Sequence, residues 1–181
     1  MERILRNRNL IGRNSKGFTL IEMLIVIIVL GILAMLIIPQ ITVSSDDART
    51  NTLQSNLNTM RSAIELYYHE HSQIYPGSTK QTDGTAVISD AEAATAFPLQ
   101  LTLYTDINGQ TNNSKTAVFK YGPYLKGGKL PLNPYTSTYT IECDFDEADI
   151  TIRTATTTSA WRFFPLTGVL IANDSAAHAL F

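Results

Sequence analysis

The sequence Lys16-Gly17-Phe18-Thr19-Leu20-Ile21-Glu22 opens the stretch that decides the fold, and from Met23 to Ile38 every following residue is apolar or glycine. The segment from Phe18 to Ile38 would form a helix of roughly 30 Å, the thickness of the hydrocarbon layer of a bilayer. Within it, Thr19 and Glu22 alone are polar. The stretch can therefore span a membrane.

Glu22 is the one ionisable residue in this stretch. An ionised carboxylate inside lipid is costly unless it is neutralised or paired, so an acidic residue there is a candidate for a functional site. The alternative is that Glu22 lies near the membrane surface, where its side chain reaches water.

A signal peptide and a plain membrane anchor are the two simpler accounts of the segment. A secretory signal peptide has an apolar core of about 7–15 residues and a small-residue cleavage site, whereas this run is longer and ends at Pro39. A plain membrane anchor fits the length. Five basic residues and only Glu2 precede Phe18, which predicts that residues 1–17 lie in the cytoplasm and the chain after Pro39 lies outside.

The residues from Lys16 to Glu22 resemble the class III signal of type IV pilins and of the pseudopilins of type II secretion. The resemblance implies that a prepilin peptidase cuts after Gly17 and methylates the new amino terminus at Phe18. It also implies that Glu22 meets the charged amino group of Phe18 on a neighbouring subunit during assembly. Glu22 would then have the partner that electrostatics requires.

These features predict a leader over residues 1–17 and a membrane or filament-core helix over 18–41. Pro39 should loosen that helix, and Gly31 permits close approach of a second helix. An amphipathic continuation is predicted over 42–73, because apolar residues recur there at steps of three and four: Leu53, Leu57, Met60, Ile64, Tyr67 and Tyr68.

The rest of the chain, residues 74–181, reads as a globular domain. Its first part, 74–135, is predicted as a loop region with a surface loop over 78–92 and a short helix from Pro98 to Asp106. The β-sheet is expected within 136–173 as an antiparallel meander of short strands over 138–143, 149–154, 160–164 and 169–172. The amphipathic helix would cover its apolar face, which gives an α+β pilin fold.

Composition restricts the function. Residues 18–181 hold nine Lys and Arg, fourteen less the five before Phe18, and fifteen Asp and Glu, sixteen less Glu2, so the net charge is −6. We therefore expect no nucleic-acid partner. No nucleophile or phosphate-loop motif is present, which predicts that the chain is not an enzyme.

The single cysteine, the histidines near residue 70 and one acidic run are three minor features of the sequence. The single Cys143 excludes an intramolecular disulfide and is expected to be buried. His69 and His71 are expected to be solvated, because positions i and i+2 of a helix point to different sides. Asp144, Asp146 and Asp149 form an acidic run, which gives a weak hypothesis of a calcium site. The simpler account is that these residues lie in a solvated turn. No other cofactor is expected.

The resemblance predicts a structural subunit of a periplasmic type II secretion pseudopilus, with type IV pilin and non-assembling membrane-anchored binding module as alternatives. Its implied partners are further copies of the chain, other pilin-like subunits, prepilin peptidase, the inner-membrane assembly platform protein and, before assembly, membrane lipid. The implied location is the inner membrane, with the C-terminal domain in the periplasm, or outside the cell for a true pilus.

Overall fold

The computed structural model of the protein describes residues 17–181, apart from the side chains of residues 36–44. The predicted leader therefore lies outside the described residues, except for Gly17. The chain divides into two compact units, Met1–Ser44 and Ser45–Phe181. The sequence placed a change of helix character close by, between residues 41 and 42.

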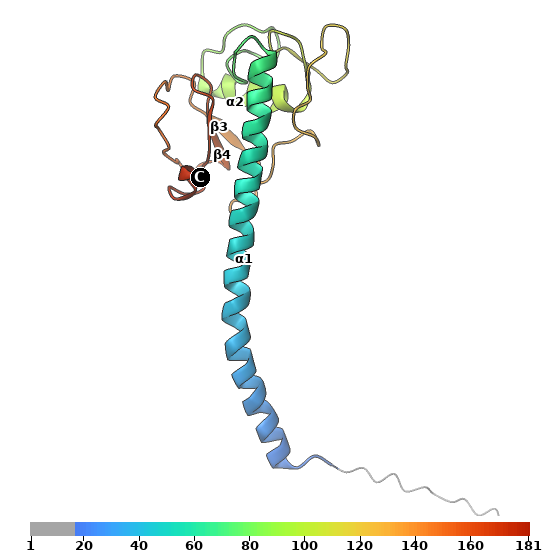
Figure 1. Ribbon diagram of the computed structural model, residues 1–181, viewed down its shortest axis with the longest axis vertical. Coiled ribbons are helices and arrows are strands. Elements are labelled where there is room, and N and C mark those ends of the chain that lie inside the picture. The colour runs from blue at the N-terminus through green and yellow to red at the C-terminus, as the bar shows by residue number, and fades with distance from the viewer. Residues whose placement is uncertain (1–16) are drawn as a thin grey trace, which may run out of the picture. The chain divides into compact units, whose positions relative to one another are not determined.

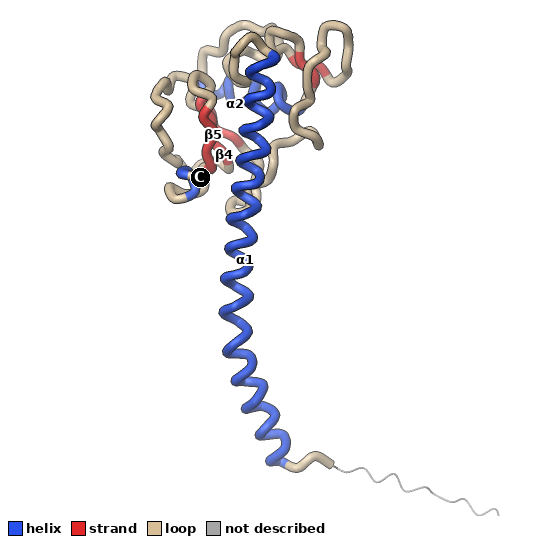
Figure 2. The backbone as a smooth tube through the Cα atoms, viewed as in Figure 1, coloured by secondary structure: helices blue, strands red, loops and turns tan. Residues whose placement is uncertain are grey.

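The longest element is helix α1, Leu20–Glu70, of 51 residues, which is drawn as one blue tube in Figure 2. Within the second unit its buried residues are five of those predicted from the amphipathic pattern, together with Ala63, which was not predicted, and Tyr68 is half-buried. The helix ends where Ser72 and Gln73 adopt left-handed backbone angles, at φ 55° and 63°. The helix thus ends at Glu70, three residues before the end of the continuation predicted over 42–73.

Small hydroxyl residues lie along this second half, three of them exposed and Thr50 half-buried. Each donates a hydrogen bond of 2.8–3.0 Å to the carbonyl oxygen four residues earlier in the helix. These residues are Thr50, Thr52, Thr59 and Ser62. Their hydroxyl groups are thus satisfied by their own helix.

The second helix, α2, runs from Asp90 to Thr102 and contains Pro98 in its interior. The predicted helix from Pro98 to Asp106 was therefore wrong in its bounds, and the predicted surface loop ends earlier than residue 92. The start is fixed by a cap, because Ser89 Oγ accepts from Glu92 N at 3.3 Å and the Glu92 carboxylate accepts from Ile88 N at 2.9 Å. The motif Ser-x-x-Glu that signals this start was present in the sequence.

In the part of the chain that the structure describes, five short strands form two sheets. The smaller sheet pairs β1, Tyr104–Thr105, with β2, Thr111–Asn112. The larger sheet has the order β3-β4-β5, with β3 at Ile141–Cys143, β4 at Trp161–Phe164 and β5 at Val169–Ala172. A single 3-10 turn, η1, His178–Leu180, follows it.

The larger sheet is mixed, which corrects the predicted antiparallel meander. Strands β4 and β5 form the predicted hairpin, with Phe164 opposite Val169, but β3 and β4 run parallel, with Ile141 opposite Trp161. Residues 149–154 form no strand, so the strand predicted there was wrong. Because parallel neighbours need a long crossover, residues 144–160 serve as the connection between β3 and β4.

The core of the second unit lies between α1, α2 and the larger sheet (Figure 1). Phe97 on α2 meets Phe163 on β4 with ring centroids 4.4 Å apart, and Trp161 is fully buried with its indole N–H donating to Pro131 O at 2.9 Å. An α+β pilin-like fold, with the helix covering the sheet, is therefore confirmed for residues 45–181.

The loops beside α2 are tied together by one buried amide. Gln100 accepts a hydrogen bond from Gly77 N at 2.7 Å and donates to Thr79 O at 2.9 Å and Gly109 O at 2.8 Å. Gly109 has φ 85°, and a Cβ atom there would lie 2.8 Å from the Gln100 amide nitrogen. Only glycine fits this turn without displacing the amide.

Candidate functional site

The first candidate site is the apolar start of α1. Every described residue from Gly17 to Met35 is exposed, and the exposed fraction of the large apolar residues there runs from 44% at Met23 to 87% at Leu20. Phe18, the predicted methylation position, is 78% exposed. Burying one such side chain stabilises by about 1.5–3 kcal/mol, so the segment as a whole strongly favours an apolar cover from lipid or from other helices.

Glu22 takes part in a capping arrangement at the start of this helix. Its Oε2 accepts hydrogen bonds from Thr19 N and Thr19 Oγ1, both at 2.7 Å, while Glu22 N donates to Thr19 Oγ1 at 3.3 Å. This is the reciprocal pattern of a capping box. It satisfies N–H groups that a helix start leaves without partners.

This role of Thr19 was missed by the sequence interpretation, which treated Glu22 only as a partner for another subunit. The signal was available, because Thr19-Leu20-Ile21-Glu22 fits the capping-box pattern Thr-x-x-Glu. The Oε1 atom of Glu22 has no hydrogen-bond partner among the described residues. One carboxylate oxygen thus serves the helix and the other is left for a further contact.

The predicted positions of helix loosening are Gly31 and Pro39. A Cβ atom built on Gly31 would meet nothing within 4 Å, so its surface is open. The α1 backbone is helical across Pro39, whose side chain lies outside the description. Loosening at Pro39 remains a prediction.

Within the part of the chain that the structure describes, no helix combines the length and the apolar character of a membrane span. The predicted span over residues 18–41 includes residues 36–41, whose side chains lie outside that description.

The acidic run gives the calcium hypothesis no support. Asp144 accepts from Arg162 at 2.8 Å, and Asp149 accepts from Thr151 N and its hydroxyl at 2.8 and 2.7 Å. Across residues 17–181, excluding the undescribed side chains, no group of three metal-ligating side chains comes together.

His71 corrects the expectation that both histidines are solvated. It is 1% exposed, its ring stacks on Tyr67 with centroids 3.7 Å apart, and its Nε2 lies 2.9 Å from Thr105 Oγ1. Burial lowers its pKa, against the opposing effects of the Tyr67 carbonyl and of nearby Asp106. His69 is exposed as predicted. The helical spacing does send the two rings to different sides, but one of those sides faces the core.

Cys143 is buried at 1% exposure, which confirms the prediction. Burial raises the pKa of its thiol, so the reactive thiolate is disfavoured.

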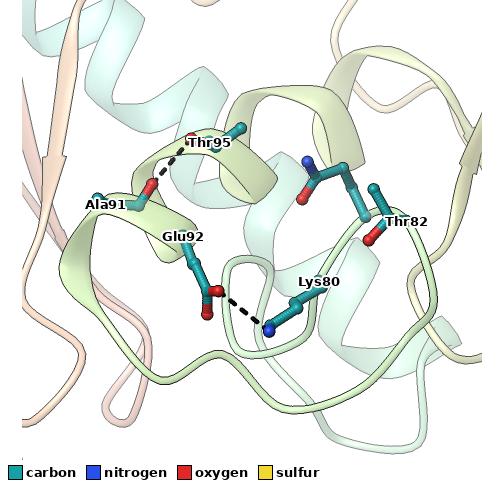
Figure 3. A pocket seen from close by; sticks show the side chains of 6 residues that line it. Lys80, Thr82, Ala91, Glu92 and Thr95 are labelled. Carbon is teal, nitrogen blue, oxygen red and sulfur yellow. Dashed lines mark hydrogen bonds and ion pairs between the residues drawn. The ribbon is translucent and has the colours of Figure 1, made fainter.

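The pocket beside α2 has a volume of about 330 Å³ and is drawn in Figure 3. Lys80 and Glu92 lie across it as an ion pair at 3.0 Å, and the Thr95 hydroxyl donates to Ala91 O at 2.8 Å. The charged groups of this pocket therefore neutralise each other, and the exposed start of α1 remains the stronger candidate site.

Comparison with known proteins places these features in a family. A family model described as the prokaryotic N-terminal methylation motif matches residues 12–38. Type II secretion system core protein G of Pseudomonas aeruginosa is 30% identical over 127 residues, which are 70% of this chain and 72% of the relative. The protein of the same name from Vibrio cholerae is 25% identical over 78% of this chain and 80% of its own.

A shorter match is a ComG operon protein 3 homolog of Bacillus licheniformis, 36% identical over 32% of this chain and 60% of the relative. No solved structure gives a significant match. Most of the methylation motif lies on the exposed apolar helix that begins with the Thr19–Glu22 cap, and a match of 127 residues is too long to lie within the first unit alone. The chain therefore belongs to the pseudopilin family of type II secretion system core protein G.

Proposed function

We propose that the protein is a structural subunit of the periplasmic pseudopilus of type II protein secretion. In this proposal prepilin peptidase cuts between Gly17 and Phe18 and methylates the amino group of Phe18. The mature chain waits in the inner membrane, with lipid around its apolar helix and its C-terminal domain in the periplasm. The assembly platform protein then extracts it into a helical filament with further copies and other pilin-like subunits.

The observation that carries the proposal is that every described residue at the apolar start of α1 is exposed, in a chain of this family. No described part of the same chain covers it. In a filament, neighbouring copies of this helix would cover one another, so the apolar area left open in one subunit is buried by assembly.

The Glu22 carboxylate adds a geometric argument. Its Oε2 is held by Thr19, which orients the group at the start of the helix, while Oε1 has no described partner. A charged amine of Phe18 from the next subunit could therefore bind Oε1 without breaking the cap. Such a contact neutralises the only charge in this apolar segment.

The first test is the intact mass of the protein from membranes of cells with and without prepilin peptidase. We expect loss of residues 1–17 and addition of one methyl group, both dependent on the peptidase. An unchanged Met1 in both strains would refute processing and with it the proposed pathway.

Substitutions at the cap then separate the two roles of Glu22. Glu22→Gln retains a capping acceptor but removes the charge, and we expect normal processing with filament yield reduced about tenfold or more, because a charge-assisted contact contributes about 1.5–3 kcal/mol. Thr19→Ala is the matched control, since it weakens the cap and leaves the carboxylate. Equal assembly of Glu22→Gln and wild type would show that pairing by Glu22 is not required.

A further inference from the structure

Two loops of the globular unit carry opposite charge. Between Asp106 and Glu142 the charged residues are all lysines, and all four are exposed: Lys115, Lys120, Lys126 and Lys129. From Glu142 to Asp149 the charged residues are all acidic: Glu142, Asp144, Asp146, Glu147 and Asp149. We name residues 113–120 the basic loop and residues 144–150 the acidic loop.

The charges at the tips of these loops are not neutralised within the described part of the chain. The basic-loop lysines form no ion pair there, and Lys120 lies over the ring of Tyr121, 5.1 Å from its centroid. In the acidic loop Asp144 binds Arg162, but Asp146, Glu147 and Asp149 have no described cationic partner. The nearby Arg153 donates instead to the carbonyl oxygens of Ile150 and Ile152, at 2.7 and 2.9 Å.

Each loop also presents one large apolar side chain to solvent. Val118 is 62% exposed between Lys115 and Lys120, on a turn in which Thr116 Oγ1 accepts from Val118 N at 3.3 Å and Phe119 N at 3.1 Å. Ile150 is 65% exposed directly after Asp149. The two loops therefore match in kind, a β-branched residue flanked by charges, and differ in the sign of the charge.

The two loops cannot meet within one molecule. Figure 1 shows the basic loop, drawn in olive at the upper right, on one side of the α1 segment of this unit, and the acidic loop, drawn in orange-brown at the left, on the other. Two different complementary patches on opposite sides form a heterologous contact, which repeats from copy to copy and builds an open chain of subunits.

We infer that the basic loop of one copy docks on the acidic loop of the next, with Val118 against Ile150 and the lysines against Asp146, Glu147 and Asp149. This inference rests on the proposed function and specifies where the globular units of neighbouring filament subunits touch. The charges select the partner and its orientation, and the two apolar side chains lose their exposed surface.

Cysteine cross-linking tests the contact in the full chain, expressed in cells with the secretion machinery. The double variant Val118→Cys, Ile150→Cys is treated with copper phenanthroline, which oxidises two thiols to a disulfide by removing two electrons and two protons. We expect a ladder of dimers, trimers and longer products, because each copy would be linked on both sides. Native Cys143 is buried and should contribute no bands.

The matched control is Val118→Cys with Leu166→Cys, since Leu166 is also exposed, at 58%, but lies in the β4–β5 turn. This pair and both single variants should give no ladder. Normal filaments of the 118/150 variant without a ladder would overturn the inference and leave the proposed function intact. Absence of filaments from the wild type would refute the proposed function and the inference with it.

Charge reversal tests the contact without new cysteines. Lys120→Glu and Asp146→Lys should each reduce the filament yield several-fold, because each places like charges together. Both positions are exposed. The variant with both substitutions should recover most of the yield, because the reversed charges again complement each other in the next copy. Failure of the double variant to exceed the single variants would contradict the inference.

Discussion

The two halves of α1 differ in which molecule buries their apolar side chains. Over residues 20–35 the helix is apolar on all sides and every side chain is exposed, whereas residues 53–67 are apolar on one side, and that side is packed on α2 and the sheet. The apolar side chains of the second half are buried within their own chain, whereas those of the first half can be buried only by lipid or by other molecules. The difference shows that one helix can serve two separate steps, folding and assembly.

The largest expected effect comes from truncating the self-buried half. Leu57 is 1% exposed, and Leu57→Ala should lower the free energy of unfolding of the globular unit by about 2–5 kcal/mol, because it removes buried methyl groups and leaves a cavity. The measurement is denaturant unfolding of the full chain in detergent, followed by the fluorescence of Trp161.

Ile27→Ala is the matched substitution in the other half, where Ile27 is 63% exposed. It should leave the Trp161 transition unchanged and reduce filament yield instead. A shift of the transition as large as that of Leu57→Ala would contradict the division of roles between the two halves.

A smaller effect is expected from pH at the end of the self-buried half. Burial holds the pKa of His71 below its ordinary value of about 6.5, so the unfolded chain takes up a proton first as the pH falls. The free energy of unfolding should therefore decrease as the pH falls below about 6.5, until the folded pKa is passed. His71→Gln should flatten this decrease, and His69→Gln, at an exposed position, should retain it.

Loss of a helix cap in the globular unit should lower its free energy of unfolding by about 1 kcal/mol. Ser89→Ala removes the acceptor for Glu92 N at the start of α2, and N-cap serines contribute about 0.5–2 kcal/mol. Thermal unfolding would detect it. The same kind of change at the exposed half, Thr19→Ala, should leave thermal unfolding of the globular unit as it is in the wild type.

The smallest expected effect concerns the ion pair of Lys80 and Glu92. Its side chains are 27% and 35% exposed, and exposed pairs contribute about 0.2–1 kcal/mol. Lys80→Gln should therefore shift the unfolding midpoint only slightly, and the shift should shrink further in high salt. A decrease in the free energy of unfolding as large as that of Leu57→Ala would mean that this surface pair has a structural role that its exposure does not suggest.

Sequence patterns predicted the features that depend on neighbouring residues. The apolar side of α1 and the antiparallel pairing of β4 with β5 were correct, because helical periodicity and a short hairpin are local properties. The parallel pairing of β3 with β4 was missed, because no local pattern specifies which distant strand will be a neighbour. Residues 149–154 alternate like a strand, yet Asp149 folds back onto Thr151 and begins a turn.

The candidate site was predictable to a similar degree. The apolar segment and Glu22 were evident from the residues alone, but the cap from Thr19 was overlooked although its motif is local. His71 was misassigned for a different reason. Its environment depends on Thr105, which lies far along the chain, and spacing within one helix carries no information about such a partner.

The self-satisfied hydroxyl groups on the exposed side of α1 have a consequence for desolvation. A polar surface usually loses hydrogen bonds to water when another molecule covers it, and each unpaired group then costs about 1–3 kcal/mol. Thr52, Thr59 and Ser62 already donate to carbonyl oxygens of their own helix. Water can therefore leave these three hydroxyl groups without stranding their donors, whereas the side-chain amides of Gln54 and Asn58 on the same side would need new partners.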